Sequence, residues 1–194
     1  SEALGARIRD RADELGYRPS RVARALKTGR SGTLGLVMPD LTNPLFPRIA
    51  QTLAQAADGR QLGILIADSR GSESEQTEAL RRLVDRGVDG LLVVPSRGTT
   101  IAPQPRPTVV INAASDPVNT VSADHHGGGR LIAAHMLALG HRHLAFLGND
   151  PVSLVQQDRI AGMLAARDAH PDATEAHVLW GDEGLDRLPF LVAQ

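Results

Sequence analysis

The chain has 194 residues, of which 42% are hydrophobic, 22% charged and 3% aromatic, and its formal net charge is −1. This length permits one sizeable core or two small lobes, and no apolar run approaches the roughly 18 residues that a membrane span needs. Cysteine is absent, which excludes a disulfide framework and a thiolate nucleophile, and the first residues lack the apolar stretch of a signal peptide, so we expect a cytoplasmic protein.

Charge is distributed unevenly along the chain. Residues 1–30 hold eight Lys and Arg residues against four Asp and Glu residues, a net of +4, so residues 31–194 carry −5. A basic N-terminal segment followed by an acidic remainder favours a polyanionic partner for residues 1–30. A solvated helix without any partner gives the same pattern.

Two short helices are predicted before the first strand. Residues 1–15 carry an apolar face formed by Leu4, Ile8, Ala12 and Leu15, and Gly16 is a natural stop. A second helix is predicted over residues 20–26, with Val22, Ala25 and Leu26 on its apolar side and Arg21, Arg24 and Lys27 on the rest. Because seven or eight residues are too few for a stable isolated helix, this segment needs a surface on which to fold.

From residue 34 onward, strands and helices alternate. Strands are predicted over residues 34–38, 62–67, 90–94, 108–111, 120–123, 144–147 and 177–180, and helices over 43–57, 73–85, 129–139 and 158–169. Such alternation is typical of an α/β fold with a doubly wound parallel sheet. The Pro-rich residues 101–107 form a surface connection.

Five segments in this order carry a resemblance: ELGYRPSRVARALKTGRSGTLGLVMPDLTNPLF, RLVDRGVDGLLVVPS, PTVVINAASDPVNTVSAD, HMLALGHRHLAFLG and DRIAGMLAA. Together they resemble the transcriptional regulators of the LacI/GalR type. The resemblance implies periplasmic-binding-protein-like lobes at residues 34–122 and 123–194, the second incomplete. It also implies the third helix of a DNA-binding headpiece at 1–16 and a hinge helix with its linker at 17–33, so the chain is interpreted as truncated at both ends.

In such regulators the hinge helix folds on operator DNA and inserts a leucine into the minor groove. The resemblance places DNA contacts at Ser20, Arg21, Arg24, Ala25, Leu26 and Lys27. Leu26 would be the wedge that kinks the duplex, and the basic side chains would contact phosphates in a salt-dependent way. Without the resemblance, the pattern favours the interpretation of Val22 and Leu26 as a connector packed on the core. Without the rest of the headpiece we expect weak, salt-sensitive DNA binding.

The family binds a small effector, most often a sugar or a related metabolite, between its two lobes, and open parallel sheets bind ligands at the carboxyl ends of their strands. The candidate effector contacts are Phe46, Asp68, Asn112, Asp124, Ser153 and Arg159. Arg159 matches the family's ligand-binding arginine at a helix start, and its guanidinium suits vicinal hydroxyls or a carboxylate.

Each candidate contact has a structural alternative. Phe46 suits ordinary core packing, Asp68 suits capping, and Asn112 suits a turn. Asp124 lies at the expected crossover between lobes and is a weaker candidate, as is Ser153. Arg159 would also suit a surface ion pair with Asp158 or Glu175.

Neither an enzyme nor a metal site is expected. His125 and His126 are adjacent in what reads as an extended segment, so their rings should point to opposite faces, and His141 and His143 lack an accompanying ligand at suitable spacing. The glycine run 127–129 lacks the spacing of a nucleotide-binding fingerprint. We therefore expect no catalytic residue and no cofactor.

The function expected is that of a DNA-binding regulator, with operator DNA, a small effector and a second copy of the chain as partners. A periplasmic sugar-binding protein is one alternative, because it shares the fold. A truncated regulator that pairs with a complete repressor through the helix at 43–57 is another.

Overall fold

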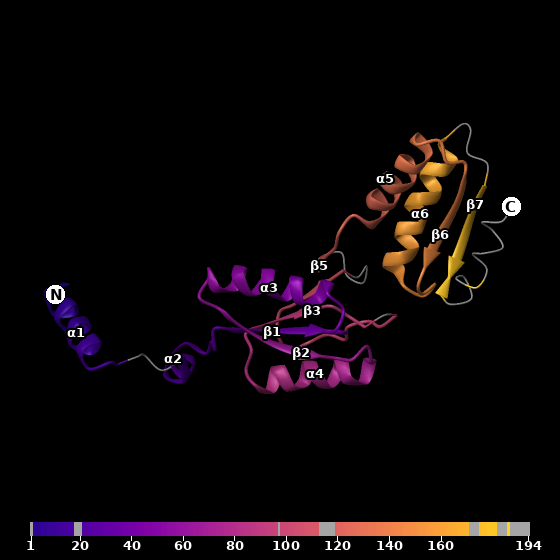
Figure 1. Ribbon diagram of the computed structural model, residues 1–194. Helices are drawn as coiled ribbons and strands as arrows, with labels where there is room; N and C mark the ends of the chain where they lie inside the picture. The colour runs from indigo at the N-terminus through magenta and orange to yellow at the C-terminus, as the bar shows by residue number, and fades with distance from the viewer. Residues whose placement is uncertain are drawn as a thin grey trace.

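A computed structural model describes residues 2–17, 21–96, 98–112, 119–170, 175–181 and 186. The helices are α1 (Glu2–Glu14), α2 (Arg21–Thr28), α3 (Leu45–Asp58), α4 (Glu73–Asp85), α5 (His125–Ala138) and α6 (Leu154–Asp168). The strands are β1 (Thr33–Met38), β2 (Gly63–Asp68), β3 (Gly90–Val93), β4 (Thr108–Ile111), β5 (Thr120–Val121), β6 (His143–Gly148) and β7 (Glu175–Trp180). They form two lobes (Figure 1).

The first lobe is a five-stranded parallel sheet in the order β2-β1-β3-β4-β5. Its central strand β1 is an apolar run whose side chains alternate between faces. Val37 packs in the core cluster with Leu80 and Leu83 of α4, whereas Leu36 and Met38 pack in the cluster on the α3 face. One helix therefore covers each face, as Figure 1 shows. This confirms the predicted doubly wound parallel sheet.

The second lobe is built on the parallel pair β6 and β7. Leu144 and Phe146 of β6 pack against Ile160 of α6 and Leu137 of α5. His143, Ala145 and Leu147 alternate with them and are exposed. Within the described part of the chain, α5 and α6 cover one face of this sheet. Helices on both faces of a sheet are therefore observed in the first lobe.

Most predicted boundaries agree with the structure to within two residues, but two helices begin four residues earlier than predicted. Helix α5 starts at His125 because the Asp124 carboxylate accepts a hydrogen bond from the Gly127 amide at 2.7 Å and caps the helix. The sequence pattern does not predict this start because the beginning of α5 contains three glycines, and glycine is a poor helix former. Helix α6 starts at Leu154 instead of residue 158.

Helices α1 and α2 lie outside both lobes, at the N-terminal end of the structure (Figure 1). The predicted apolar face of α1 is exposed at Leu4, Ile8 and Leu15. Within the described residues, no helix has the length and apolar character needed to cross a bilayer.

Asp89 fastens the linker after α2 to the first lobe. Its carboxylate accepts hydrogen bonds from the Ser31 and Gly32 amides, both at 2.8 Å, and from the Ser31 hydroxyl at 3.2 Å. Burial raises the pKa of this carboxyl, but the hydrogen bonds from residues 31–33 together outweigh burial and hold the pKa below 3.8. The linker is therefore anchored by an ionised aspartate.

Asp89→Asn is expected to lower the free energy of unfolding at neutral pH by about 1–2 kcal/mol, because charge-assisted hydrogen bonds are lost. Since the folded-state pKa is depressed, this stabilisation is present above the unfolded pKa and disappears as pH falls through the folded pKa. Urea unfolding of both proteins from neutral to acid pH should therefore converge at the acid end.

Asp85→Asn is the matched control, because Asp85 forms only an exposed pair with Arg81. Parallel pH profiles for the wild type and Asp89→Asn would show that the linker is not anchored in this way.

Candidate functional site

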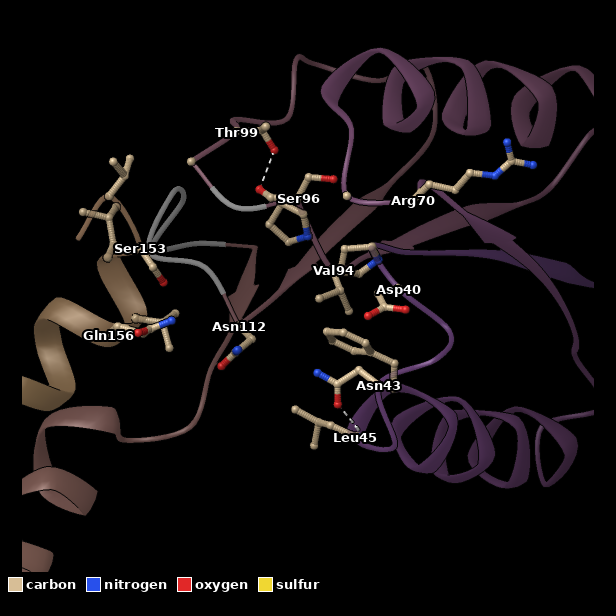
Figure 2. A pocket seen from close by; sticks show the side chains of 18 of the residues that line it. Asp40, Asn43, Leu45, Arg70, Val94, Ser96, Thr99, Asn112, Ser153 and Gln156 are labelled. Atoms are coloured by element: carbon tan, nitrogen blue, oxygen red, sulfur yellow. Dashed lines mark hydrogen bonds between the residues drawn. The ribbon is translucent and has the colours of Figure 1, made fainter. Parts of the chain in front are cut away.

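A cleft of about 870 Å³ lies between the two lobes. Its first wall consists of residues that follow β1, β2, β3 and β4, and its second wall is the start of α6 (Figure 2). Five of the six predicted effector contacts line it: Phe46, Asp68, Asn112, Ser153 and Arg159.

Two of these residues also have structural roles. Phe46 packs beside the cluster of Leu36, Met38 and Val94, and it also lines the cleft. The Asp68 carboxylate accepts a hydrogen bond from the Arg70 amide at 2.7 Å. Core packing of Phe46 therefore holds together with a position in the cleft, whereas Asp68 stabilises a local turn and the cap of α4 is Ser72.

The first wall contains polar residues that the sequence analysis did not select. Asp40, Ser96 and Thr99 follow strand ends and line the cleft (Figure 2). The rule that ligands meet the carboxyl ends of parallel strands could have found Asp40 and Ser96. Arg70 has a φ of 50°, which its sequence does not signal, and its side chain extends away from the other labelled residues in Figure 2.

A buried polar network supports this wall. The Ser96 amide donates to Oε1 of Gln76 at 2.7 Å, and the Ser96 and Ser69 hydroxyls lie 3.2 Å apart. The Thr99 hydroxyl donates to the Ser96 carbonyl at 2.7 Å (Figure 2). Ser69, Gln76 and Ser96 are at most 2% exposed, so the loop after β3 is held by satisfied buried groups.

The second wall comes from the first two turns of α6. Ser153 occupies the N-cap position without a side-chain cap hydrogen bond, and Gln156 holds the loop before the helix by accepting from the Asn149 amide at 2.6 Å. Arg159 therefore lies in the second turn of α6, which corrects the prediction that placed it at a helix start.

Arg159 and Asn112 meet at a third residue, His125. Asn112 Oδ1 lies 2.5 Å from Nε2 of His125, and Arg159 Nη2 lies 3.0 Å from Nδ1 of the same ring. Asn112 has a φ of 60°, a conformation that asparagine tolerates well. The structure does not show the alternative, an ion pair of Arg159 with Asp158 or Glu175. The Arg159 guanidinium contacts the His125 imidazole instead.

Asp124 is the sixth predicted effector contact, and the structure places it outside the cleft. The residue caps α5 and does not line the cleft. Because α5 begins at His125, Asp124 is the residue that satisfies the free amides of its first turn. An aspartate directly before a helix could have signalled this role.

The predicted DNA contacts lie on or before α2. Ala25 is half-buried, Lys27 is exposed, and the Leu26 side chain is 84% exposed. Ser20 and the side chains of Arg21 and Arg24 lie outside the described residues. A leucine this exposed is not a connector packed on the first lobe, so its apolar surface is available to a partner.

The histidines are arranged differently from expectation. His125 and His126 begin a helix and do not lie in an extended segment, because α5 starts early. His143 and His177 both contact Glu175, at 3.5 and 2.9 Å. Among the residues that the structure describes, no group of three or more His, Cys, Asp or Glu side chains could hold a metal ion. The cleft offers hydroxyls, carboxylates, amides and the guanidinium groups of Arg70 and Arg159 for reversible binding.

Comparison with known proteins gives a consistent result. Residues 31–188 match the family described as periplasmic binding proteins and sugar binding domain of LacI family. The maltose regulon regulatory protein MalI of Escherichia coli is 31% identical over 175 residues, covering 85% of this chain and 51% of that protein. The transcriptional repressor PurR of Aliivibrio fischeri is 27% identical over 196 residues, covering 94% and 57%. The chain thus spans about half the length of these curated relatives.

Solved structures share the fold. The Cra transcriptional dual regulator of Pseudomonas putida, in complex with fructose 1-phosphate, has 25% identity and a TM-score of 0.67, covering 84% of this chain and 64% of that one. A putative LacI-family regulator from Sanguibacter keddieii has 26% identity and a TM-score of 0.68, covering 84% and 63%. These relatives are described as regulators of transcription.

Proposed function

The chain belongs to the family of periplasmic binding proteins and LacI-type sugar-binding domains, and we propose that it acts as an effector-responsive transcriptional repressor. A sugar or related metabolite binds in the cleft, and α2 contacts the minor groove of operator DNA as a hinge helix. The protein acts by binding and performs no catalysis. The observation that carries this proposal is the cleft, which is lined from both lobes by five residues selected from the sequence.

The cleft suits a small polyhydroxylated ligand. Amide and carboxylate side chains can bind hydroxyls, Phe46 offers an apolar wall, and the Arg159 guanidinium suits a carboxylate, a phosphate or vicinal hydroxyls. A volume of about 870 Å³ is within the range of small-molecule sites. The fructose 1-phosphate complex of the Pseudomonas putida regulator makes a sugar phosphate a reasonable first probe.

The DNA-facing part of the proposal is supported by α2. An exposed leucine at the end of a basic helix suits insertion between base steps. The alternative of a secreted sugar-binding protein leaves the charge and the exposed leucine of α2 without a purpose.

The organisation proposed for the chain follows from this function. Residues 1–16 are the end of a DNA-binding headpiece, 17–33 the hinge and linker, 34–122 the first effector lobe and 123–194 part of the second. We place the protein in the cytoplasm, where it pairs with a second copy so that two hinge helices meet the duplex.

Arg159→Met is expected to weaken effector binding about tenfold or more, because a hydrogen bond to a charged group contributes about 1.5–3 kcal/mol. Calorimetric titration with fructose 1-phosphate, and with D-xylulose as a sugar that carries no phosphate, measures the affinity directly. A bound ligand should also raise the melting temperature of the wild type.

Arg130→Met is the control, because Arg130 is exposed on α5 and does not line the cleft. Equal affinity in the wild type and Arg159→Met would remove Arg159 from the site. The absence of any thermal response to sugars and sugar phosphates would count against the effector function.

A further inference from the structure

His125 connects the two walls of the cleft through one imidazole ring. Its Nε2 atom meets Asn112, which follows β4 of the first lobe, at 2.5 Å. Its Nδ1 atom meets Arg159 of α6, in the second lobe, at 3.0 Å. Asn112 and Arg159 both line the cleft, whereas His125 does not. The ring therefore contacts two residues of the binding surface without lining the cleft itself.

Only the neutral ring satisfies both contacts. The atom of Asn112 that faces the ring is its carbonyl oxygen, an acceptor, so Nε2 must carry the hydrogen. Arg159 is a donor only, so Nδ1 must present its lone pair. A second proton on the ring would go to Nδ1, where it removes that acceptor and faces the guanidinium with a like charge.

The surroundings favour the neutral ring. Burial lowers the pKa of His125 below its ordinary value of 6.5, and the positive charge of Arg159 lowers it further. Asp158 of α6 and Asp124 before α5 act in the opposite direction without reversing the shift. Because the folded-state pKa is depressed, the contact between Nδ1 and Arg159 is intact above the ordinary pKa and is lost as pH falls through the lowered one. The hydrogen on Nε2, which faces Asn112, is present in both forms of the ring.

We propose that His125 is a positioning residue that joins the two walls of the effector cleft through Asn112 and holds Arg159 while its ring is neutral, and that protonation releases Arg159. This inference rests on the proposed function only for its consequence, which is that effector affinity falls as the ring becomes protonated. The joining of the lobes itself needs no effector and no DNA.

Two variants at this position and one control at its neighbour separate the joining of the lobes from the titration of the ring. In His125→Gln the side-chain amide can donate to Asn112 and accept from Arg159, but it has no proton to gain near neutral pH. His125→Ala removes both contacts at every pH. His126→Gln is the matched control, because His126 is the exposed neighbour on the same turn of α5.

The test measures the distance between the lobes in the full chain. Because the chain has no cysteine, spin labels can be placed at two cysteines introduced at the exposed positions Gln55 of α3 and Ala161 of α6. The wild type and His126→Gln should give a narrow distance distribution both at neutral pH and near pH 5, because the Nε2–H donor to Asn112 is present in the neutral and in the protonated ring. His125→Gln should stay narrow at both pH values, and His125→Ala should be broad at both.

Nitrogen NMR of the His125 ring is the second measurement. The Nε2–H form should be observed at neutral pH, and Arg159→Met should raise the midpoint of titration toward 6.5. A distance distribution in His125→Ala that matches the wild type at neutral pH would overturn the proposal, as would a ring that titrates above 6.5.

Failure of this inference can be told apart from failure of the proposed function. If the ring titrates as described and His125→Ala loosens the lobes, but fructose 1-phosphate and D-xylulose do not bind, only the effector function is lost. If a probe binds with the same affinity across this pH range in the wild type and His125→Gln alike, the role of His125 is refuted and the effector function stands.

Discussion

Gly129→Ala is expected to destabilise the second lobe of the protein strongly. Helices α5 and α6 cross where two glycines stand at their contact. A Cβ atom on Gly129 would collide with the backbone carbonyl of Arg159, and one on Gly162 would collide with the backbone carbonyl of His126. Because the obstructing atoms are backbone, the only relief is to separate the helices.

The cost of that separation should be large for this lobe. Overfilling a packed core typically costs about 1–3 kcal/mol, and the upper end applies where no side chain can rotate away. The described part of the lobe has only β6, β7 and these two helices around its core. Thermal melting followed by circular dichroism should show the second lobe unfolding at a markedly lower temperature.

Gly128→Ala is the control on the same helix turn. A Cβ atom at Gly128 meets nothing within 4 Å, and alanine is favoured over glycine inside a helix by about 0.5–1 kcal/mol. This substitution should leave the lobe folded and slightly more stable. If Gly129→Ala melts at the same temperature as Gly128→Ala, the close crossing of α5 and α6 is not part of the native protein.

The same crossing explains what the sequence could and could not predict. The alternation of apolar runs and helical patterns predicts the parallel sheet, because it depends on local periodicity. The start of α5 is not predicted because glycine is a poor helix former. The structural reason for Gly129 is its close contact with the backbone of Arg159 in α6, which no local pattern in the sequence indicates.

The residues of the cleft also divide into those that the sequence predicts and those that it does not. Phe46, Asp68 and Asn112 could be found because residues at the ends of parallel strands converge. The contact of His125 with Asn112 and Arg159 joins three separate elements, so no spacing in the sequence indicates it.

Leu26→Ala is expected to weaken DNA binding about tenfold to hundredfold at low salt. Moving a leucine side chain from water into a base step provides about 1.5–3 kcal/mol of apolar stabilisation, which offsets part of the cost of unstacking. Since Leu26 is 84% exposed in the free protein, its loss should change the free energy of unfolding by less than about 0.5 kcal/mol.

Fluorescence anisotropy with a labelled A·T-rich duplex measures this affinity. Leu139→Ala is the control, since Leu139 follows α5 and is also 63% exposed. It removes the same apolar group from a surface that the proposed function keeps away from DNA. An equal loss of affinity in both variants would indicate nonspecific apolar adhesion.

The insertion of Leu26 into a duplex can be observed through the bases themselves. An A·T-rich duplex carrying 2-aminopurine at its central step should brighten when the wild-type chain binds at about 50 mM salt, and the signal should largely disappear by about 200 mM because phosphate contacts are lost. Leu26→Ala at saturating concentration should bind without brightening. Brightening of equal size in the wild type and Leu26→Ala, or binding without any brightening, would contradict a hinge helix that wedges its leucine into the minor groove.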